Sequence, residues 1–164
     1  MAGSKLIETR EQLRRTVEAI RSAGQTIAFT NGCYDLLHVG HIRSLQGARG
    51  CGDRLIVGVN SDASVRRNKG LHLPIVPEAE RAEVLAALAC VDHVFVFDDP
   101  TVDALLELIR PDAYCKGTEY TVETLPERDT VRRLGLTFRQ VGDPKDHSTT
   151  QLIERIASAS TQRR

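Results

Sequence analysis

Short apolar runs alternate with amphipathic segments along the chain, which is the pattern of a parallel sheet covered by helices. Apolar residues from Leu6 to Ile20 recur at helical spacing among charged side chains, so we expect a first helix at 7–22. The other apolar runs predict five strands, at 26–30, 55–59, 93–97, 113–116 and 136–141. Further helices are expected at 39–51, 77–90, 102–110, 128–134 and 149–158, with a polar loop at 60–70. The sequence therefore predicts a doubly wound, five-stranded parallel α/β sheet with an extra N-terminal helix.

The same pattern divides the chain of 164 residues into one main domain and two short ends. We expect an N-terminal helix packed on the domain at 1–24, the domain itself at 25–158, and a frayed tail at 159–164. Ligands of open parallel sheets bind beyond the carboxyl ends of the strands. Functional residues are therefore expected just after strands, at 31–41, 60–70, 116–120 and 142–150.

Charge and composition exclude several classes of partner. The chain carries 22 basic and 22 acidic side chains and no tryptophan, which does not favour binding to nucleic acid. No apolar run is long enough for a membrane span, and the polar start of the chain does not resemble a secretory signal. The cysteines at 33, 51, 90 and 115 are scattered without a CxxC pair, so no zinc or redox site is predicted. A cytoplasmic protein with reduced thiols is expected.

The strongest chemical signal is His38-Val39-Gly40-His41, directly after the first strand of the predicted domain. Two histidines three residues apart at a helix start face the same side, beside free N–H groups where phosphate binds readily. Gly40 leaves room for a phosphate to approach the backbone. The alternatives are a purely structural histidine pair and a zinc site, but no third zinc ligand stands at useful spacing. We interpret the pair as donors to a phosphate that undergoes in-line displacement.

Residues 30–41, Thr-Asn-Gly-Cys-Tyr-Asp-Leu-Leu-His-Val-Gly-His, resemble the signature of the cytidylyltransferase-like nucleotidyltransferases. Within that superfamily the chain is most similar to the nucleotidyltransferase domain of ADP-heptose synthase, also called D-glycero-D-manno-heptose 1-phosphate adenylyltransferase. The likeness covers about 5–157, and further matching stretches are Asn60–Ser64, Lys69-Gly70, Pro74–Pro77, Glu80-Arg81, Pro111–Gly117 and Ser148–Thr150. The resemblance implies a Rossmann-like domain at 25–158 with an HxGH motif that binds nucleotide phosphates.

The resemblance also implies roles for particular residues. The expected catalytic residues are His38, His41, Lys69 and Thr149. The expected nucleotide contacts are Asn31, Gly32, Cys33, Tyr34, His38, Gly40, His41, Lys116, Gly117, Ser148, Thr149 and Thr150. The expected contacts of the second substrate are Asp35, Asn60, Asp62, Lys69 and Arg81. No protein metal site is predicted, because Mg²⁺ is expected to arrive mainly on the triphosphate.

Several of these residues have a structural alternative. Ser148 to Thr150 would also make a plain helix cap, and Asp35 would also close an Asx turn. Arg81 on a helix surface would also serve as a salt-bridge partner, and Lys69 as part of a solvated loop. Asn60 and Asp62 would also order that loop.

The implied reaction joins ATP to a heptose 1-phosphate and releases pyrophosphate, with a separate sugar kinase as the source of the sugar phosphate. The rival within the class uses CTP with glycerol 3-phosphate or phosphoethanolamine, and a non-catalytic nucleotide-binding module is the alternative outside it. The chain departs from the ADP-heptose pattern at Leu73, at Thr118-Glu119 and at 143–147, which are segments expected near the base and the acceptor. Relatives are often homodimers, and the sequence leaves the oligomeric state open.

Overall fold

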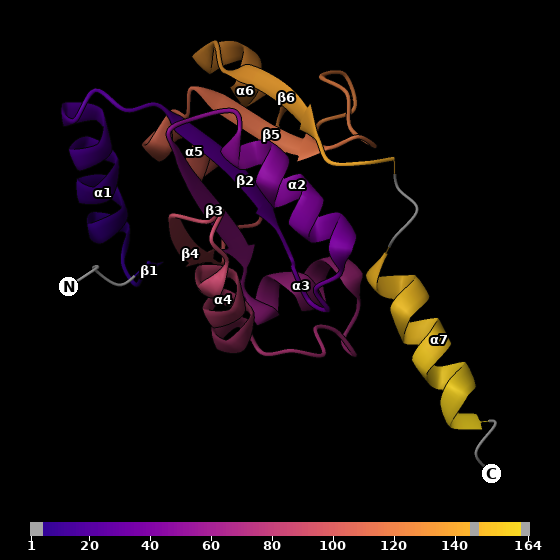
Figure 1. The fold of residues 1–164 in the computed structure, drawn as a ribbon. Coiled ribbons are helices and arrows are strands. Elements are labelled where there is room, and N and C mark those ends of the chain that lie inside the picture. Colours follow the sequence, from indigo (N-terminus) through magenta and orange to yellow (C-terminus); the bar gives the residue numbers. More distant parts are fainter. Residues whose placement is uncertain (1–4, 145–147, 162–164) are drawn as a thin grey trace.

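A computed structural model describes residues 5–144 and 148–161 of the chain. Its centre is a six-stranded parallel sheet in the order β1-β4-β3-β2-β5-β6 (Figure 1). The strands are β1 (Leu6–Ile7), β2 (Ile27–Gly32), β3 (Arg54–Asn60), β4 (His93–Phe97), β5 (Ala113–Gly117) and β6 (Thr137–Val141). The helices are α1 (Arg10–Ser22), α2 (Val39–Arg49), α3 (Asp62–Lys69), α4 (Glu78–Ala87), α5 (Asp103–Ile109), α6 (Arg128–Leu134) and α7 (Thr149–Thr161). The doubly wound parallel sheet predicted from the sequence is confirmed.

Helices cover both faces of the sheet because neighbouring residues of each strand point to opposite sides. Phe29 of β2 belongs to a core with Leu13 of α1, Leu105 of α5 and Val131 of α6. The preceding residue, Ala28, belongs to a second core on the other face, which is formed mainly with α2 and α4. Both cores are buried, so the near-continuous apolar runs of the central strands are explained.

The strand order reverses beside β2. The chain passes from β2 to β3 and β4 on one side, then crosses back through α5 to place β5 and β6 on the other. The crevice beyond the carboxyl ends of β2 and β5 is the topological switch point, where ligands bind in sheets of this kind. The fold therefore brings the segments after β2 and β5 together at one edge.

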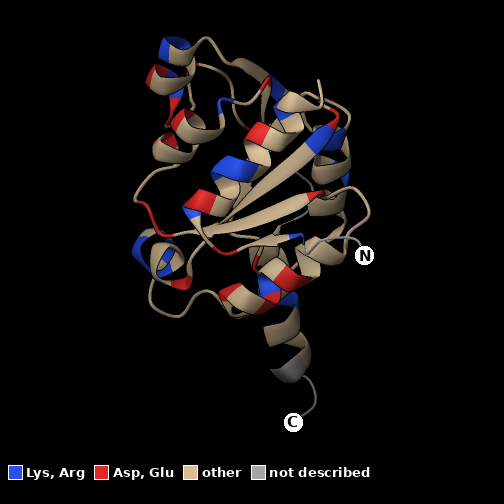
Figure 2. Ribbon diagram, turned by 90° about the vertical axis from the view of Figure 1, so that its left-hand side faces the viewer, with Lys and Arg blue, Asp and Glu red and all other residues tan. Residues whose placement is uncertain are grey.

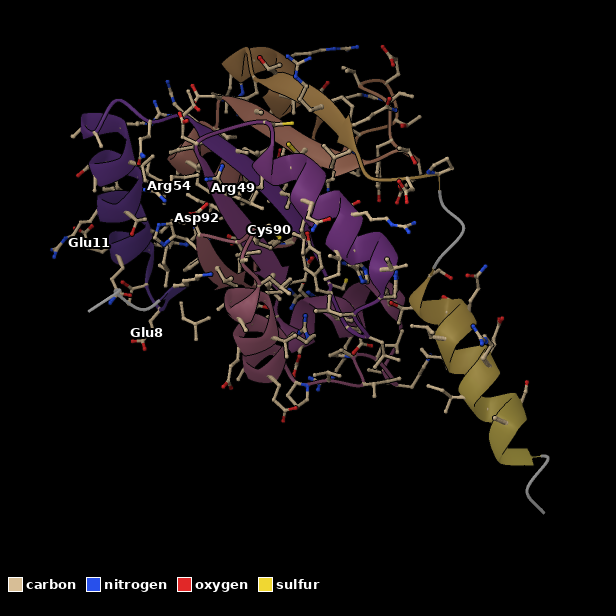
Figure 3. All side chains as sticks on the ribbon, in the orientation of Figure 1. Glu8, Glu11, Arg49, Arg54, Cys90 and Asp92 are labelled. Atoms are coloured by element: carbon tan, nitrogen blue, oxygen red, sulfur yellow. The ribbon has the colours of Figure 1, made fainter. Side chains whose placement is uncertain are left out.

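Ion pairs stabilise the opposite, amino-terminal edge of the sheet. Asp92, just before β4, lies 3.1 Å from Arg49 of α2 and 3.1 Å from Arg54 of β3. These three side chains point toward one another in Figure 3. A carboxylate oxygen of Asp92 also accepts the N–H of Leu55 at 2.8 Å. This cluster fixes α2 and two strands relative to one another, away from the candidate site.

Two short elements, α3 and β1, were missed in the sequence analysis. The expected loop at 60–70 contains α3, which begins after the N-cap Ser61, whose side chain accepts the N–H of Ser64. The expected helix at 7–22 begins only at Arg10, because Thr9 and Gln12 form a capping box. Ile7 instead pairs with β4 as part of the two-residue strand β1, so the sheet has six strands where five were expected.

The other predicted elements lie within a few residues of their positions, and β4 and α6 match theirs. The last helix, α7, runs to Thr161, three residues beyond its predicted end at Ser158. Of the predicted tail, 162–164 lie outside the described residues, as do 1–4 of the N-terminal segment and 145–147. Within the described ranges, no helix is long and apolar enough to cross a membrane. Figure 2 shows that acidic and basic residues are interspersed over the helices in this view.

Candidate active site

A cavity of about 420 Å³ lies at the switch point, beyond the carboxyl ends of β2, β3, β5 and β6. This volume is within the range of small-ligand sites in proteins. Predicted site residues that line it are Asn31, Gly32, Cys33, Tyr34, His38, Gly40, His41, Asn60, Lys69, Lys116, Gly117, Ser148, Thr149 and Thr150. The structure therefore brings together one set of residues that the sequence distributes over more than a hundred positions.

The two histidines stack face to face at the start of α2. Their ring centroids are 3.8 Å apart and the ring planes differ by 26°. His38 is the N-cap residue in extended conformation, and its side chain makes no capping hydrogen bond to α2. The first turn of a helix has N–H groups without intrahelical partners, and the positive end of the helix dipole lies there. Imidazoles and backbone donors are thus combined at one wall of the cavity.

A tyrosine in the turn between β2 and α2 packs against His41. Tyr34 adopts a left-handed backbone conformation with φ of 50°, and its ring meets that of His41 edge-on at 5.5 Å. Tyr34 is 8% exposed, and burial raises the pKa of its hydroxyl to about 12. The tyrosine is therefore a neutral packing surface for the histidine. A left-handed residue with a side chain is uncommon, and such strain occurs mostly at functional sites.

His41 is a neutral imidazole in the structure. Burial lowers its pKa to about 4, and the neighbouring His38 and Lys69 lower it in the same direction. Its Nδ1 atom is buried, and no described residue offers it a hydrogen bond. A neutral imidazole donates one N–H, so His41 can stabilise a developing phosphate charge as a hydrogen-bond donor without carrying a charge of its own.

Lysines supply positive charge at two other walls. Lys69 is the last residue of α3, where Gly70 with φ of 106° turns the chain. Lys116 is in β5 and only 11% of its side chain is exposed. Burial lowers the pKa of Lys116, while the carboxylate of Glu127 at 3.9 Å acts in the opposite direction. Phosphate oxygens are the natural partners of cations in such a cavity.

The start of α7 forms another part of the cavity lining, beside the turn that leads into α2. The Ser148 hydroxyl accepts the N–H of Gln151 at 3.2 Å, which makes Ser148 the cap of the helix. Thr149 donates its hydroxyl to the carbonyl oxygen of Leu36 at 3.4 Å, so α7 is joined to the turn before α2. Figure 1 shows α7 extending from this point away from the sheet. Two helix starts, with their positive dipole ends, therefore border the same cavity.

Three residues predicted to contact the second substrate do not line the cavity. The Asp35 carboxylate accepts the N–H groups of Ile75 and Val76 at 2.8–3.0 Å. The Arg81 side chain is 0% exposed and contacts Asp62 at 2.7 Å. It also donates to the carbonyl oxygens of residues 33 and 76. Each has polar contacts to protein groups outside the cavity lining, and their expected contact with the second substrate stays a prediction. They connect the turn after β2 with α3 and the start of α4.

The cavity is also lined by residues that had no individual role in the sequence analysis. Glu119, Tyr120, Asp143 and Pro144 fall within the expected ranges 116–120 and 142–150, whereas Thr30, Ser44 and Val141 fall outside all of them. Ser44 stands three residues after His41 on the same face of α2, so helical spacing could have indicated it. Glu119 and Asp143 lie on two of the three segments that depart from the ADP-heptose pattern. Val141 and Thr30 are strand residues that reach the edge of the sheet, and only the register identifies them.

No group of three or more histidine, cysteine or acidic side chains within the described residues could hold a metal ion. Glu119 and Asp143 are the carboxylates that line the cavity. Magnesium commonly binds through one or two carboxylates plus substrate phosphates, keeping several waters. The donor set therefore fits a metal that is carried by a triphosphate better than one held by the protein itself.

Fold and site together define a nucleotidyltransferase: a parallel α/β domain whose stacked histidines, helix starts and lysines meet at the switch point. The comparison with family models agrees, since the model described as cytidylyltransferase-like matches residues 29–158. The chain belongs to the cytidylyltransferase-like family.

Relatives and solved structures resemble the chain over most of its length. It is 49% identical over 150 residues to the bifunctional protein HldE of Syntrophotalea carbinolica and 45% identical over 157 residues to that of a Bradyrhizobium species. These matches cover 92% and 96% of the chain, which spans only about a third of the length of these relatives.

Among solved structures, the lipopolysaccharide core biosynthesis protein of Thermoplasma volcanium has a TM-score of 0.63 at 26% identity, over 74% of this chain and 100% of that one. Pantoate-beta-alanine ligase of Francisella tularensis has a TM-score of 0.61 at 15% identity, over 88% of this chain and 68% of that one. The second likeness concerns the fold alone.

Proposed function

We propose that the protein transfers the adenylyl group of ATP to a heptose 1-phosphate, most specifically D-glycero-D-manno-heptose 1-phosphate, giving ADP-heptose and pyrophosphate. The observation that carries this proposal is the stacked pair His38 and His41 at the start of α2, in a cavity that the start of α7 and two lysines also line. The relatives named HldE and the likeness to a lipopolysaccharide core biosynthesis protein support a sugar phosphate as the acceptor.

The proposed chemistry is a single in-line displacement. An oxygen of the acceptor's phosphate attacks the α-phosphorus of ATP, and the bond from that phosphorus to the oxygen bridging to the β-phosphorus breaks. The electron pair leaves with pyrophosphate, and Mg²⁺ carried by the triphosphate would neutralise part of its charge. No side chain forms a covalent intermediate. Positioning and electrostatic stabilisation provide most of the rate in reactions of this type.

Individual residues have distinct roles in this scheme. His38 and His41 donate hydrogen bonds to the oxygens of the α-phosphate, where negative charge grows in the transition state. Lys116 and the start of α7 at Thr149 neutralise the β- and γ-phosphates. Lys69, at the end of α3, binds the acceptor's phosphate. Asn60, which also lines the cavity and donates to Ser64 at 3.1 Å, lies on the acceptor's side.

The test is pyrophosphate release from ATP, CTP, GTP or UTP, each with a heptose 1-phosphate, glycerol 3-phosphate or phosphoethanolamine. Turnover of ATP with a heptose 1-phosphate is the expected result. Turnover restricted to CTP and a small phosphate alcohol would retain the mechanism and refute the substrates. A protein that binds ATP and releases no pyrophosphate with any acceptor would be a binding module, and the proposal would be wrong.

The histidines provide the sharper test of mechanism. Replacing His41 with Asn should lower kcat by about 10²- to 10³-fold, the usual effect of removing one donor from a charge-stabilising site. The matched control is His93→Asn, because His93 begins β4 at the opposite, amino-terminal edge of the sheet. The control should leave kcat within about twofold of the wild type. Equal losses in both variants would mean that His41 acts through folding and not through the reaction.

A further inference from the structure

Glu127 is a buried carboxylate next to the cavity that the proposed chemistry does not use. It stands immediately before α6 and is 6% exposed. Its Oε1 atom lies 3.9 Å from the Nζ atom of Lys116. Its Oε2 atom is buried, and no described residue donates a hydrogen bond to it. Burying a carboxylate costs free energy unless a cation or hydrogen bonds compensate it, and here the Lys116 ammonium and the nearby Tyr114 hydroxyl do so.

Lys116 in turn has few other groups to hold it. Its ammonium is 3.5 Å from the carbonyl oxygen of Asn31 and lies 5.7 Å and 5.4 Å from the ring centres of Tyr114 and Tyr120. Aromatic faces attract a cation but do not fix its direction as a carboxylate does. The separation of 3.9 Å from Glu127 is longer than a hydrogen bond. The ammonium is thus held by charge while its N–H groups remain able to turn toward a ligand.

The electrostatics agree with this geometry. Burial lowers the pKa of Lys116, and Glu127 is the largest of the influences that raise it, ahead of Cys33 and Glu119. The tyrosines that face the ammonium are neutral, because burial raises the pKa of Tyr114 and that of Tyr120. Cys33 follows β2 and Glu119 follows β5, whereas Glu127 approaches from α6. The charge that opposes the effect of burial on Lys116 therefore comes mainly from Glu127.

We propose that Glu127 is a positioning residue, which keeps Lys116 protonated and directed into the cavity that the stacked histidines line. It touches no ligand itself and acts through Lys116. The phosphate-binding part of this inference rests on the proposed function. The coupling between the two side chains does not, and it can be measured in the protein without substrate.

The first experiment titrates the side-chain amine of Lys116 in the full chain labelled with ¹⁵N-lysine. The signal is assigned by its absence in Lys116→Met. In Glu127→Gln the midpoint should move to lower pH, since the ammonium loses its nearest negative charge. The matched control, Glu123→Gln, removes an exposed carboxylate four residues earlier and should leave the midpoint unchanged. An unchanged midpoint in Glu127→Gln would overturn the proposal.

The second experiment separates positioning from a general structural role. Pyrophosphate release is measured for Glu127→Gln, for Lys116→Met and for the double variant. Glu127→Gln alone should lower kcat/KM by roughly 10- to 100-fold and move the alkaline limb of its pH profile to lower pH, as expected for a displaced catalytic cation. In the Lys116→Met background the same change should cost less than about twofold, because the residue it acts through is gone. Equal losses in both backgrounds would overturn the proposal.

Glu127→Asp protects the test against simple misfolding. It keeps the negative charge and should hold the Lys116 midpoint closer to that of the wild type than Glu127→Gln does, even if α6 starts less stably. A midpoint that falls equally in both variants would show that packing and not charge matters, which also refutes the inference. Absence of turnover in the wild type would refute the proposed function alone, since the titration decides the coupling between Glu127 and Lys116 without it.

Discussion

Removal of Arg81 should destabilise the protein far more than it weakens substrate binding. The Arg81 side chain is 0% exposed, and its guanidinium bridges Asp62 at 2.7 Å and the carbonyl oxygen of Val76 at 2.9 Å, besides that of Cys33. It thereby joins α3, the start of α4 and the turn after β2. Each of these segments adjoins residues that line the cavity. Arg81 therefore fixes the positions of these segments without lining the cavity itself.

The magnitude follows from what Arg81→Met would leave unpaired. Breaking a buried ion pair costs about 3–5 kcal/mol, and each carbonyl left without a donor adds up to about 1–3 kcal/mol. Asp62 is 22% exposed and keeps Arg66 at 3.9 Å, which reduces the first contribution. The two carbonyls alone correspond to roughly 2–6 kcal/mol, so with the reduced ion-pair contribution a total loss of at least about 4 kcal/mol is expected. This is a large fraction of the roughly 5–15 kcal/mol by which most domains are stable. Arg81→Lys should lose about 1–3 kcal/mol, because a point charge replaces only one of the three contacts.

Urea unfolding followed by circular dichroism measures these differences, and Arg66→Met is the matched control. Arg66 approaches the same carboxylate at 3.9 Å but is 48% exposed, so its loss should cost less than about 1 kcal/mol. The reasoning would be refuted if Arg81→Met unfolded within about 1 kcal/mol of the wild type while the KM for the sugar phosphate rose strongly. Arg81 would then be a ligand contact, as the sequence resemblance suggested.

Two further predictions concern stability. The pKa of His41 is lowered from 6.5 to about 4 in the folded protein. As the pH falls, His41 therefore takes up its proton at a higher pH in the unfolded chain than in the folded one. The contribution of His41 to the free energy of unfolding should be complete above about pH 6.5. It should decrease as the pH falls toward 4, by at most about 3 kcal/mol. An NMR titration should place the His41 midpoint near 4, and a midpoint near 6.5 would contradict this. Gly52→Ala should cost about 1–3 kcal/mol in urea unfolding, since the new methyl group would stand 2.7 Å from the backbone nitrogen of Ala28. Gly50→Ala, at a φ of −70° that any residue adopts, is its control and should change stability by less than about 1 kcal/mol; equal losses would reject the steric explanation.

The sequence predicts best those features that repeat locally. Alternating strands and helices identified the parallel sheet, and the position of His38 and His41 after a strand identified the wall of the cavity. The helix α3 was missed because its short sequence buries little beyond Ser64 and Val65, so it has no apolar period to recognise. Strand β1 was missed because two residues carry no pattern, and they form a strand only by pairing with β4.

The environment of a charged side chain is the part that local sequence does not encode. Arg81 looks like a surface residue of an amphipathic helix, and only the packing of α4 against the turn after β2 shows that it is buried. Asp35 likewise suited either a contact with the second substrate or an Asx turn, and its contact with the N–H groups of Ile75 and Val76 spans forty positions. Such pairs depend on tertiary contacts between segments that are distant in the chain.

The charge balance of the site explains why one such distant contact matters. At neutral pH the lowered pKa of His41 removes it as a source of positive charge, so the cations at the cavity are lysines. Lys116 is the more buried of the two lysines that line the cavity, and burial alone would favour its neutral form. A nucleotide triphosphate needs that charge at the moment when pyrophosphate departs. The burial that strengthens the hydrogen bonds of the histidines therefore also lowers the pKa of Lys116. Glu127, which does not line the cavity, acts in the opposite direction and keeps the lysine charged.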